Sequence, residues 1–233
     1  MGGFANNAPI VTDGLVFYVD AGNGNSYPGS GTTWSDLVGS NDGTFSATPT
    51  TDSANGGSIV FDGADDYVGT GNTFVSSQNS PFTFAAWFKA GDQTSSSGSI
   101  VRPFIIQSGT NAAVIIDLSM YRAGSIDHGK LRFTVGDGVS TIRTTNTYND
   151  EVWYYAVGTS DGSNTYLYVN GQQEAAGSTS SIGTPSTVSI GGDPIFNNSR
   201  WFLGNIAIAS IYNRALSSDE ILQNYNALKN RFV

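Results

Sequence analysis

Apolar and polar residues alternate with a period of two along much of this chain, which is typical of β-strands. The clearest example is the segment 153–172. Its first run, 153–158, is apolar or aromatic at both parities, as in a strand that is covered on both faces. A Ser-Asp-Gly-Ser-Asn loop at 160–164 leads to a second run, 165–169, and an Asn-Gly pair marks the next reversal at 170–171. The pattern predicts a β-hairpin.

Short runs of the same kind recur along the chain at the spacing of hairpins. Further strands are predicted at 15–20, 59–61, 67–68, 82–90, 104–107, 113–118, 130–135, 188–190 and 205–212. Segments rich in glycine and asparagine, such as 21–31, predict surface loops between them. We therefore predict an all-β fold, a two-sheet antiparallel jelly-roll sandwich.

Only the C-terminal end has the periodicity of a helix. Ser217 and Glu220 have the spacing of a capping box, and Leu216 precedes the cap where it can pack on Ile221. These signals predict a short helix over 217–230. The apolar stripe expected to pack on the sandwich comprises Ile221, Leu222, Tyr225 and Leu228.

Four stretches of the chain resemble, in the expected order, laminin-G-like domains of the concanavalin A-like lectin/glucanase superfamily. They are 59–68 (IVFDGADDYV), 82–89 (FTFAAWFK), the hairpin 153–172 and 204–217 (GNIAIASIYNRALS). The resemblance implies a β-sandwich with a C-terminal helix. It does not specify a function, because this fold carries lectins, adhesins, glycosidases and structural modules.

Composition agrees with one sandwich domain that is large enough to bury a core. The 233 residues include 29 glycines and only 12% charged residues, which favours many short strands and tight turns. We expect residues 1–12 to be a loosely held arm and 13–233 to form the domain. The absence of cysteine excludes disulfides and thiolate metal sites. A net charge of −9 disfavours nucleic acid and anionic membranes as partners.

The titratable residues argue against an enzyme. His128 is the only histidine and lies in a turn sequence, so a Ser-His or Cys-His nucleophile is improbable. Related glucanases carry Glu-x-Asp-x-Glu on one strand, and this chain has no such run. Its only glutamates are Glu151, Glu174 and Glu220. Neighbouring Asp65 and Asp66 would point to opposite faces of a strand. We predict a non-catalytic protein.

Calcium is the one cofactor that the sequence suggests. Asp62, Asp65 and Asp66 cluster as Ca²⁺ ligands do, but their spacing fits no EF-hand, which favours a plain turn. Where laminin-G-like relatives often have Ile-Asp-Glu-Val, this chain has Ile-Ala-Ile-Ala at 206–209, so an acidic pair is missing. The candidate oxygen donors for Ca²⁺ are Asp20, Asn23 and Asp62, with Asp193 in a late loop.

A sugar site needs an aromatic face for the C–H side of a pyranose and planar polar groups for its hydroxyls. Loop residues supply a candidate set. It consists of Tyr27, Trp34, Asp193, Phe196, Asn197, Asn198, Arg200 and Trp201. The alternative for Tyr27 and Trp34 is that they fold back as lids over the core, and this alternative is favoured.

The function predicted from these features is that of a lectin-like structural or decoration protein of a phage or similar virion, which binds glycans or a host surface. The chain starts with Met, lacks a signal-peptide pattern and has no cysteine, as expected of a virion protein made in the host cytoplasm. Its end, 212–232, also resembles that of laminin-G-like proteins of tailed marine phages. The alternative is a carbohydrate-binding or adhesion module of a secreted bacterial protein, acting outside the cell. Other virion proteins are expected partners, and a homo-oligomer is possible.

Overall fold

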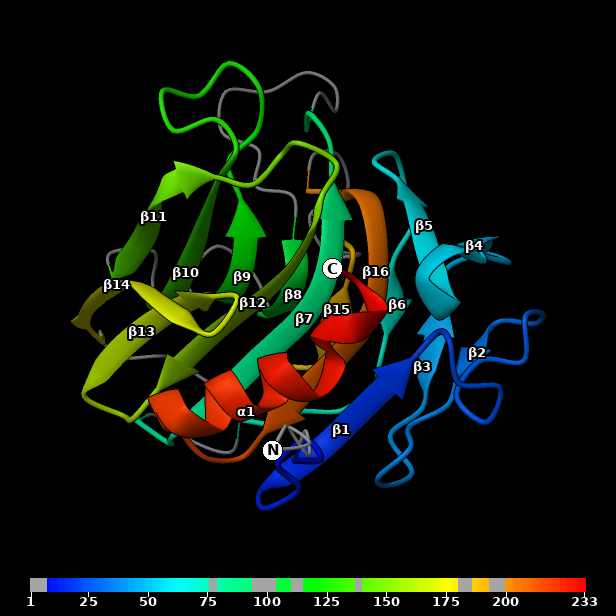
Figure 1. Ribbon diagram of the computed structural model, residues 1–233, viewed down its shortest axis with the longest axis horizontal. Coiled ribbons are helices and arrows are strands. Elements are labelled where there is room, and N and C mark those ends of the chain that lie inside the picture. The colour runs from blue at the N-terminus through cyan, green and yellow to red at the C-terminus, as the bar shows by residue number, and fades with distance from the viewer. Residues whose placement is uncertain are drawn as a thin grey trace, which may run out of the picture.

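The computed structural model describes residues 8–75, 79–93, 104–109, 115–136, 140–179, 186–192 and 200–233. Two antiparallel sheets of eight strands each are stacked face to face, with one α-helix on the outside (Figure 1). Sheet A is formed by β1 (Leu15–Asp20), β4 (Thr50–Asp52), β5 (Ser58–Asp62), β7 (Phe82–Ala90), β12 (Trp153–Ser160), β13 (Asn164–Val169), β14 (Gln172–Ser178) and β16 (Leu203–Tyr212). Sheet B is formed by β2 (Thr33–Trp34), β3 (Gly43–Phe45), β6 (Val68–Gly69), β8 (Phe104–Ser108), β9 (Ile115–Met120), β10 (Lys130–Gly136), β11 (Thr141–Thr147) and β15 (Val188–Ile190). The predicted all-β sandwich with a C-terminal helix is confirmed.

The strand order brings distant segments of the chain together. In sheet A the order is β14-β13-β12-β7-β16-β5-β4, and β1 also pairs with β16. In sheet B the order is β11-β10-β9-β8-β15-β6-β3-β2. The predicted hairpin is β12 and β13, whose register pairs Ala156 with Val169. The reversal at Asn170 and Gly171 has the positive φ angles, 51° and 80°, that an Asn-Gly turn favours.

The main core lies between the two sheets and is rich in phenylalanine. Alternate residues of β7 point into it, as the period-two pattern requires. Its largest fully buried side chains include Trp34, Phe17, Phe61, Phe84, Phe88, Phe133 and Phe202. Burying each such side chain contributes about 1.5–3 kcal/mol to stability, so this layer is the main source of the stability of the fold.

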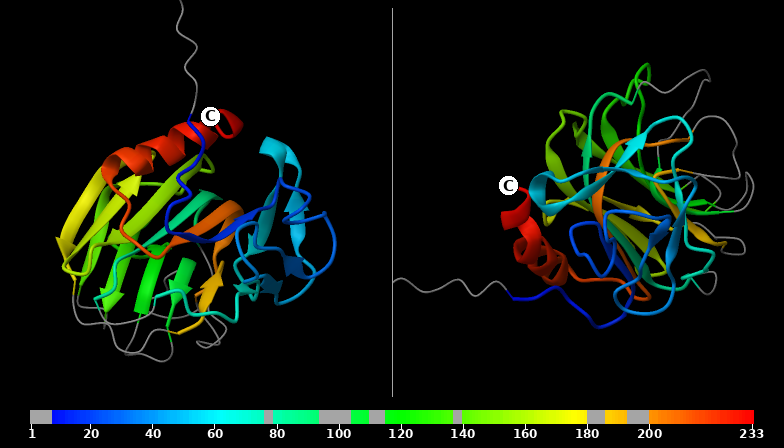
Figure 2. Two further views of the ribbon diagram at one scale, coloured as in Figure 1. Left: turned by 90° about the horizontal axis from the view of Figure 1, so that it is seen from below. Right: turned by 90° about the vertical axis from the view of Figure 1, so that its right-hand side faces the viewer.

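Helix α1 (Ser218–Leu228) lies over the outer face of sheet A (Figure 2, left). A second apolar cluster lies between the helix and the sheet. Trp87 at its centre stacks on Tyr155, with 5.4 Å between ring centroids, and on Tyr225 of the helix at 5.7 Å. The short 3₁₀ turn Lys229–Arg231 then brings Phe232 onto the same indole ring. Strand β12 is therefore covered on both faces, as predicted.

The capping signals at the start of the helix are as predicted, but the apolar stripe of the helix differs from the predicted one. Ser217 and Glu220 form the capping box, and Leu216 and Ile221 are both buried in the outer cluster. Leu222, however, is 37% exposed. A second difference is a buried polar residue on this helix.

That polar residue is Asn224, which ties the start of the chain to the helix. Its Oδ1 accepts a hydrogen bond of 2.7 Å from the Val11 amide, and its Nδ2 donates one of 3.0 Å to the Tyr212 hydroxyl. Gln223 also donates to the Pro9 carbonyl at 2.7 Å. Residues 9–11 are therefore fixed to the domain, unlike the loose arm that the sequence predicts, and residues 1–7 lie outside the described part.

Candidate functional site

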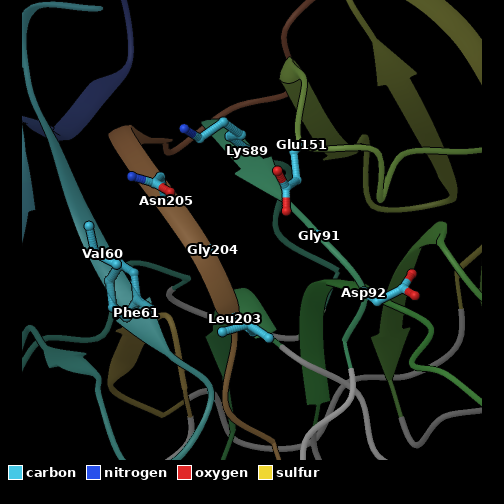
Figure 3. Close-up of a pocket in the computed structure, with 9 residues that line it drawn as sticks. All are labelled: Val60, Phe61, Lys89, Gly91, Asp92, Glu151, Leu203, Gly204 and Asn205. Atoms are coloured by element: carbon cyan, nitrogen blue, oxygen red, sulfur yellow. The ribbon is translucent and has the colours of Figure 1, made fainter. Parts of the chain in front are cut away.

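An open groove of about 520 Å³ lies on the outer face of sheet A (Figure 3). It is lined by Val60, Phe61, Lys89, Gly91, Asp92, Glu151, Leu203, Gly204 and Asn205. The lining residues come from β5, β7 and β16, from the segment that follows β7 and from the one that precedes β12. Residues far apart in the sequence thus converge through strand pairing.

Glycines keep the floor of the groove open. A Cβ atom at Gly204, whose φ is +146°, would lie 2.3 Å from the Lys89 carbonyl oxygen, closer than real Cβ atoms approach backbone. At Gly91 it would lie 3.3 Å from Glu151 Oε1. A larger residue at Gly204 would clash with backbone, whereas one at Gly91 would only crowd the Glu151 carboxylate, so the hollow depends chiefly on Gly204.

Two hydrogen-bond donors stand side by side on the groove wall. Asn205 of β16 pairs across the sheet with Lys89 of β7 on one side and with Val60 of β5 on the other. Its Nδ2 donates to Ser58 Oγ at 3.0 Å, which fixes the carboxamide. Lys89 Nζ lies 5.6 Å from the centroid of the Trp153 ring, an arrangement in which the ring attracts the ammonium group.

Two carboxylates complete the polar lining. Glu151 has a positive φ of 60° and donates its backbone N–H to the Ala90 carbonyl at 2.9 Å, so its exposed side chain stands over Gly91. Asp92 Oδ1 accepts a hydrogen bond of 2.6 Å from Asn149 and lies 3.2 Å from His128 Nε2. The only histidine of the chain is therefore tied to the rim of the groove.

This lining has mixed chemistry. The carboxylates of Glu151 and Asp92 accept hydrogen bonds, whereas Lys89 and the carboxamide of Asn205 donate them. Leu203 adds apolar surface beside these groups. Sites with apolar walls and a few fixed polar groups suit small polar ligands, and sugar hydroxyls both donate and accept hydrogen bonds. No local motif in the sequence marks this site, because its residues meet only through strand pairing.

Three of the aromatic residues predicted to contact sugars, Tyr27, Trp34 and Trp201, are buried in this structure. Trp34 is fully buried and stacks on Phe45 at 5.7 Å, and Tyr27, 4% exposed, packs edge-on against the same ring at 5.5 Å. Both rings occupy the position of lids over the core. Trp201 is 8% exposed and stacks on Tyr67 at 6.0 Å.

The other predicted sugar contacts belong to the late loop. Arg200, at its end, is partly buried. Asp193, Phe196, Asn197 and Asn198 lie outside the described residues.

The predicted calcium ligands fall into two separate places. Asp20 Oδ1 lies 2.7 Å from Arg231 Nη1 in an ion pair and also accepts the Gly22 amide at 2.8 Å. Asn23 Oδ1 accepts the Asn25 amide at 3.0 Å. Asp20 and Asn23 are thus engaged with their own surroundings.

Asp62, by contrast, belongs to an acidic cluster with Asp65 and Asp66. One carboxylate oxygen from each lies within 4.8 Å of the others, because residues 65 and 66 lie in a turn and not in a strand. Burial raises the pKa of Asp66, and the charges of Asp62 and Asp65 add to that shift. Such clustered oxygens are what Ca²⁺ requires, so the residues fit the ion chemically.

Sheet B carries a polar row on the face opposite the core. Strand pairing aligns Thr134, Asp117, Gln107, Ser189 and Gly69 across five strands. The four polar side chains of this row are buried. The row therefore offers no accessible ligand surface in this structure.

An ion pair stabilises this buried row. Arg132 Nη2 donates to Asp117 Oδ2 at 3.1 Å, with the two side chains 2% and 0% exposed. Gln107 donates to Ser189 Oγ at 2.7 Å.

Comparison with known proteins identifies the family of this fold. The sequence profile of the concanavalin A-like lectin/glucanases superfamily, in its laminin G form, matches residues 62–222, more than half of the chain. The chain belongs to this superfamily. A search of curated proteins gave no match to the concanavalin A-like chain. No helix in the described residues is long and apolar enough to cross a bilayer.

Solved structures with the same fold include domains of larger proteins. A Trypanosoma rangeli sialidase mutant with trans-sialidase activity has a TM-score of 0.70 and 20% identity, over 97% of this chain and 35% of the sialidase. Domain 4 of the Geobacillus stearothermophilus arabinanase AbnA, solved with arabinotriose, has a TM-score of 0.66 and 15% identity, over 91% of this chain and 98% of that domain. The binding domain of Paraclostridial Mosquitocidal Protein 1 has a TM-score of 0.59 and 16% identity, over 92% and 52%. The concanavalin A-like chain thus spans about a third of the sialidase, and these likenesses show the fold.

Proposed function

We propose that this protein is a non-catalytic glycan-binding module and that the groove on the outer face of sheet A holds the glycan. The observation that carries the proposal is the convergence of Lys89, Glu151 and Asn205 on one open hollow of a concanavalin A-like sandwich. The fold belongs to a lectin superfamily, and one structural neighbour was solved with arabinotriose bound. Both support a saccharide as the ligand.

The charges of the groove favour a neutral saccharide. Its lining has two carboxylates, Glu151 and Asp92, against the single ammonium group of Lys89. The whole chain carries a net charge of −9. An acidic polysaccharide would therefore meet repulsion both on approach and in the groove. Hydroxyl groups have no such cost and can satisfy donors and acceptors alike.

Binding without hydrolysis is the activity that the side chains support. Glycosidases use two carboxyl groups, one on each side of the scissile bond. Here Asp92 Oδ1 is already engaged by Asn149 and lies beside His128, away from the floor over which Glu151 stands. We expect no reducing ends to be released from any polysaccharide that the protein binds.

A glycan array tests this proposal. We compare the unaltered chain with the double variant Lys89→Met, Glu151→Gln and with a control, Asp219→Asn, Lys229→Met, which makes the same charge changes on and just after helix α1. Losing hydrogen bonds to charged groups costs about 1.5–3 kcal/mol each, so the groove variant is expected to bind about tenfold or more weakly. Equal binding by both variants and the unaltered chain would remove the groove from the proposal.

For the biological setting, we propose a structural or decoration protein of a virion, with glycans or a host surface and other virion proteins as partners. The resemblance of residues 212–232 to phage laminin-G-like proteins supports this setting. The alternative, an extracellular adhesion module, is supported by the neighbours that are domains of larger proteins. Proteomics of purified particles decides between them: stoichiometric presence supports the virion, and presence only in a longer secreted chain contradicts it. Light scattering measures whether the chain forms a homo-oligomer.

A further inference from the structure

A second hollow, of about 310 Å³, differs from the groove in having no charged lining residue. It is lined by Val16, Asn41, Asn72, Thr73, Phe74 and Asn213. These residues come from β1, from the loops that precede β3 and follow β6, and from the turn after β16. Three carboxamides converge there in a chain that has 19 carboxylates. We call this hollow the asparagine pocket.

The side chain of Asn72 is held in place from within its own loop. Its Nδ2 donates to the Thr70 carbonyl at 2.9 Å, and its backbone N–H donates to Thr70 Oγ1 at 3.3 Å. Thr70 is in turn fixed to the Val188 carbonyl of sheet B through its hydroxyl, at 2.9 Å. The carboxamide of Asn72 therefore has a defined orientation before any ligand arrives.

Asn41 is held by a different anchor, the buried carboxylate of Asp36. Asp36 Oδ1 accepts the amides of Tyr18 at 3.0 Å and Val38 at 3.1 Å, which fixes the loop to β1. Asp36 Oδ2 lies 3.4 Å from Asn41 Nδ2, which also donates to the Val16 carbonyl at 3.3 Å. The second carboxamide is thus ordered as well.

The remaining lining groups are available to a ligand. The side chains of Asn213 and Thr73 are exposed and have no hydrogen-bond partner among the described residues, while the Asn213 backbone is fixed to Gly14 at 2.9 Å. Phe74 is partly buried and packs on Phe17, with 5.3 Å between ring centroids. The pocket thus combines two ordered amides, those of Asn41 and Asn72, with one unpaired amide and one hydroxyl group beside an aromatic ring.

We propose that the asparagine pocket binds a neutral saccharide unit. Carboxamides offer both donors and acceptors, which matches sugar hydroxyls, and a part of the Phe74 ring offers a surface for C–H groups. A charged ligand would find no opposite charge in the lining, and an apolar one would leave the Asn213 amide and the Thr73 hydroxyl without partners. The volume is at the lower end of the range of about 300–1,000 Å³ for small-ligand sites, which suits one or two sugar rings better than a polymer.

This inference goes beyond the groove proposal, because the two sites share no residue and either can fail alone. Order in the free protein favours binding, since less freedom is lost when the ligand arrives. Two separate saccharide sites on one chain would also let it hold a branched or repeating glycan by two contacts, which raises the overall affinity.

The test is an NMR titration of the full chain labelled with ¹⁵N, in which the side-chain amide signals of Asn41, Asn72 and Asn213 are followed. The probes are methyl glycosides of neutral hexoses and pentoses, with glucuronate and a short uncharged peptide for comparison. We expect saturable shifts of these signals with at least one neutral glycoside. The absence of a saturable shift with every neutral glycoside, or a response to glucuronate or the peptide that is as strong, would overturn the proposal.

Variants separate this pocket from the groove. Asn72→Ala with Asn213→Ala is expected to weaken binding about tenfold or more, because two amide partners are lost. We expect glycoside binding in the asparagine pocket to be unchanged in the groove variant Lys89→Met, Glu151→Gln. The control is Asn25→Ala, which replaces an exposed asparagine outside the pocket and should also leave this binding unchanged. If Asn72→Ala impairs folding, Asn213→Ala alone carries the test. Unchanged binding in the folded asparagine variants would contradict the proposal.

Discussion

The rings of Trp87 and Phe232 stack with 4.3 Å between their centroids and 18° between their planes. This contact joins the central strand of sheet A to the penultimate residue of the chain. Phe232 follows helix α1 and belongs to the outer apolar cluster, so this contact lies at the C-terminal end of the helix. The C-terminal end is therefore part of the packing that holds the helix on the sheet.

We expect Phe232→Ala to lower the free energy of unfolding by about 3 kcal/mol, because a buried ring is replaced by a cavity. Denaturant unfolding followed by tryptophan fluorescence measures the loss. Val233→Ala is the control, since Val233 is 66% exposed and its truncation should cost less than about 0.5 kcal/mol. Equal stability of the two variants would show that the ring contributes nothing.

Because Asp117 and Arg132 form a buried ion pair in sheet B, we expect replacing one of them to destabilise the protein more than replacing both. Asp117→Ala leaves the Arg132 guanidinium uncompensated in the interior and should cost about 3–5 kcal/mol. Replacing both, with Asp117→Leu and Arg132→Met, removes the buried charge and should cost less. Asp13→Asn, at an ion pair whose carboxylate is 87% exposed, is the control. A double variant that is less stable than Asp117→Ala would refute this reading.

The pH dependence of stability should contain a contribution from Glu220. Hydrogen bonds from Arg214 at 2.6 and 2.9 Å lower the pKa of Glu220 from 4.5 to about 2. A lowered pKa means that the charged form stabilises the folded state. This stabilisation is complete above pH 4.5 and is lost as the pH falls toward 2.

At neutral pH, Glu220→Gln should therefore lower the free energy of unfolding by about 1–2 kcal/mol, because the cap and the ion pair are both weakened. The variant should unfold at a lower denaturant concentration. The difference from the unaltered chain should shrink between pH 4.5 and 2. Denaturation curves across this range measure it. A difference that stays constant with pH would contradict the assignment.

The acidic cluster makes a prediction about calcium. The pKa of Asp66 is raised, so its charged form opposes folding. The stability contributed by the protonated carboxyl group is lost as the pH rises through the raised pKa. Without metal, Asp66→Asn should raise the melting temperature at neutral pH.

If Ca²⁺ binds Asp62, Asp65 and Asp66, it should raise the melting temperature of the unaltered chain and have a smaller effect on Asp62→Asn. Identical melts in excess EDTA and in excess Ca²⁺ would exclude calcium from this site.

Buried strands and the helix could be predicted from the sequence, whereas the polar edge strands could not. Strand β7 is buried along almost its whole length, and its apolar run marks it clearly. Strands β11 and β14 lie at the edges of their sheets and read Thr-Ile-Arg-Thr-Thr-Asn-Thr and Gln-Gln-Glu-Ala-Ala-Gly-Ser. An edge strand that is exposed to solvent does not need alternating apolar and polar residues, so only its backbone pairing defines it as a strand.

The candidate sites were harder to predict than the fold. Lys89, Glu151 and Asn205 become neighbours only through the pairing and loops of sheet A, and the three asparagines of the second pocket come from three segments. Trp34 packs into the core, which is the alternative that the sequence favours, and Trp201 is buried as well, because a ring in a loop sequence can pack as readily into the core as on the surface. Glycine-rich loops give no local signal for which outcome applies.

The most direct test of glycan binding in the groove is the structure of a crystal of this chain soaked with the neutral oligosaccharide that gives the strongest array signal. We predict density for a saccharide in the groove, with its hydroxyl groups within hydrogen-bond distance of Lys89, Glu151 and Asn205. An intact glycan there would also agree with binding without hydrolysis. A saccharide bound elsewhere, with the groove empty, would contradict glycan binding in the groove.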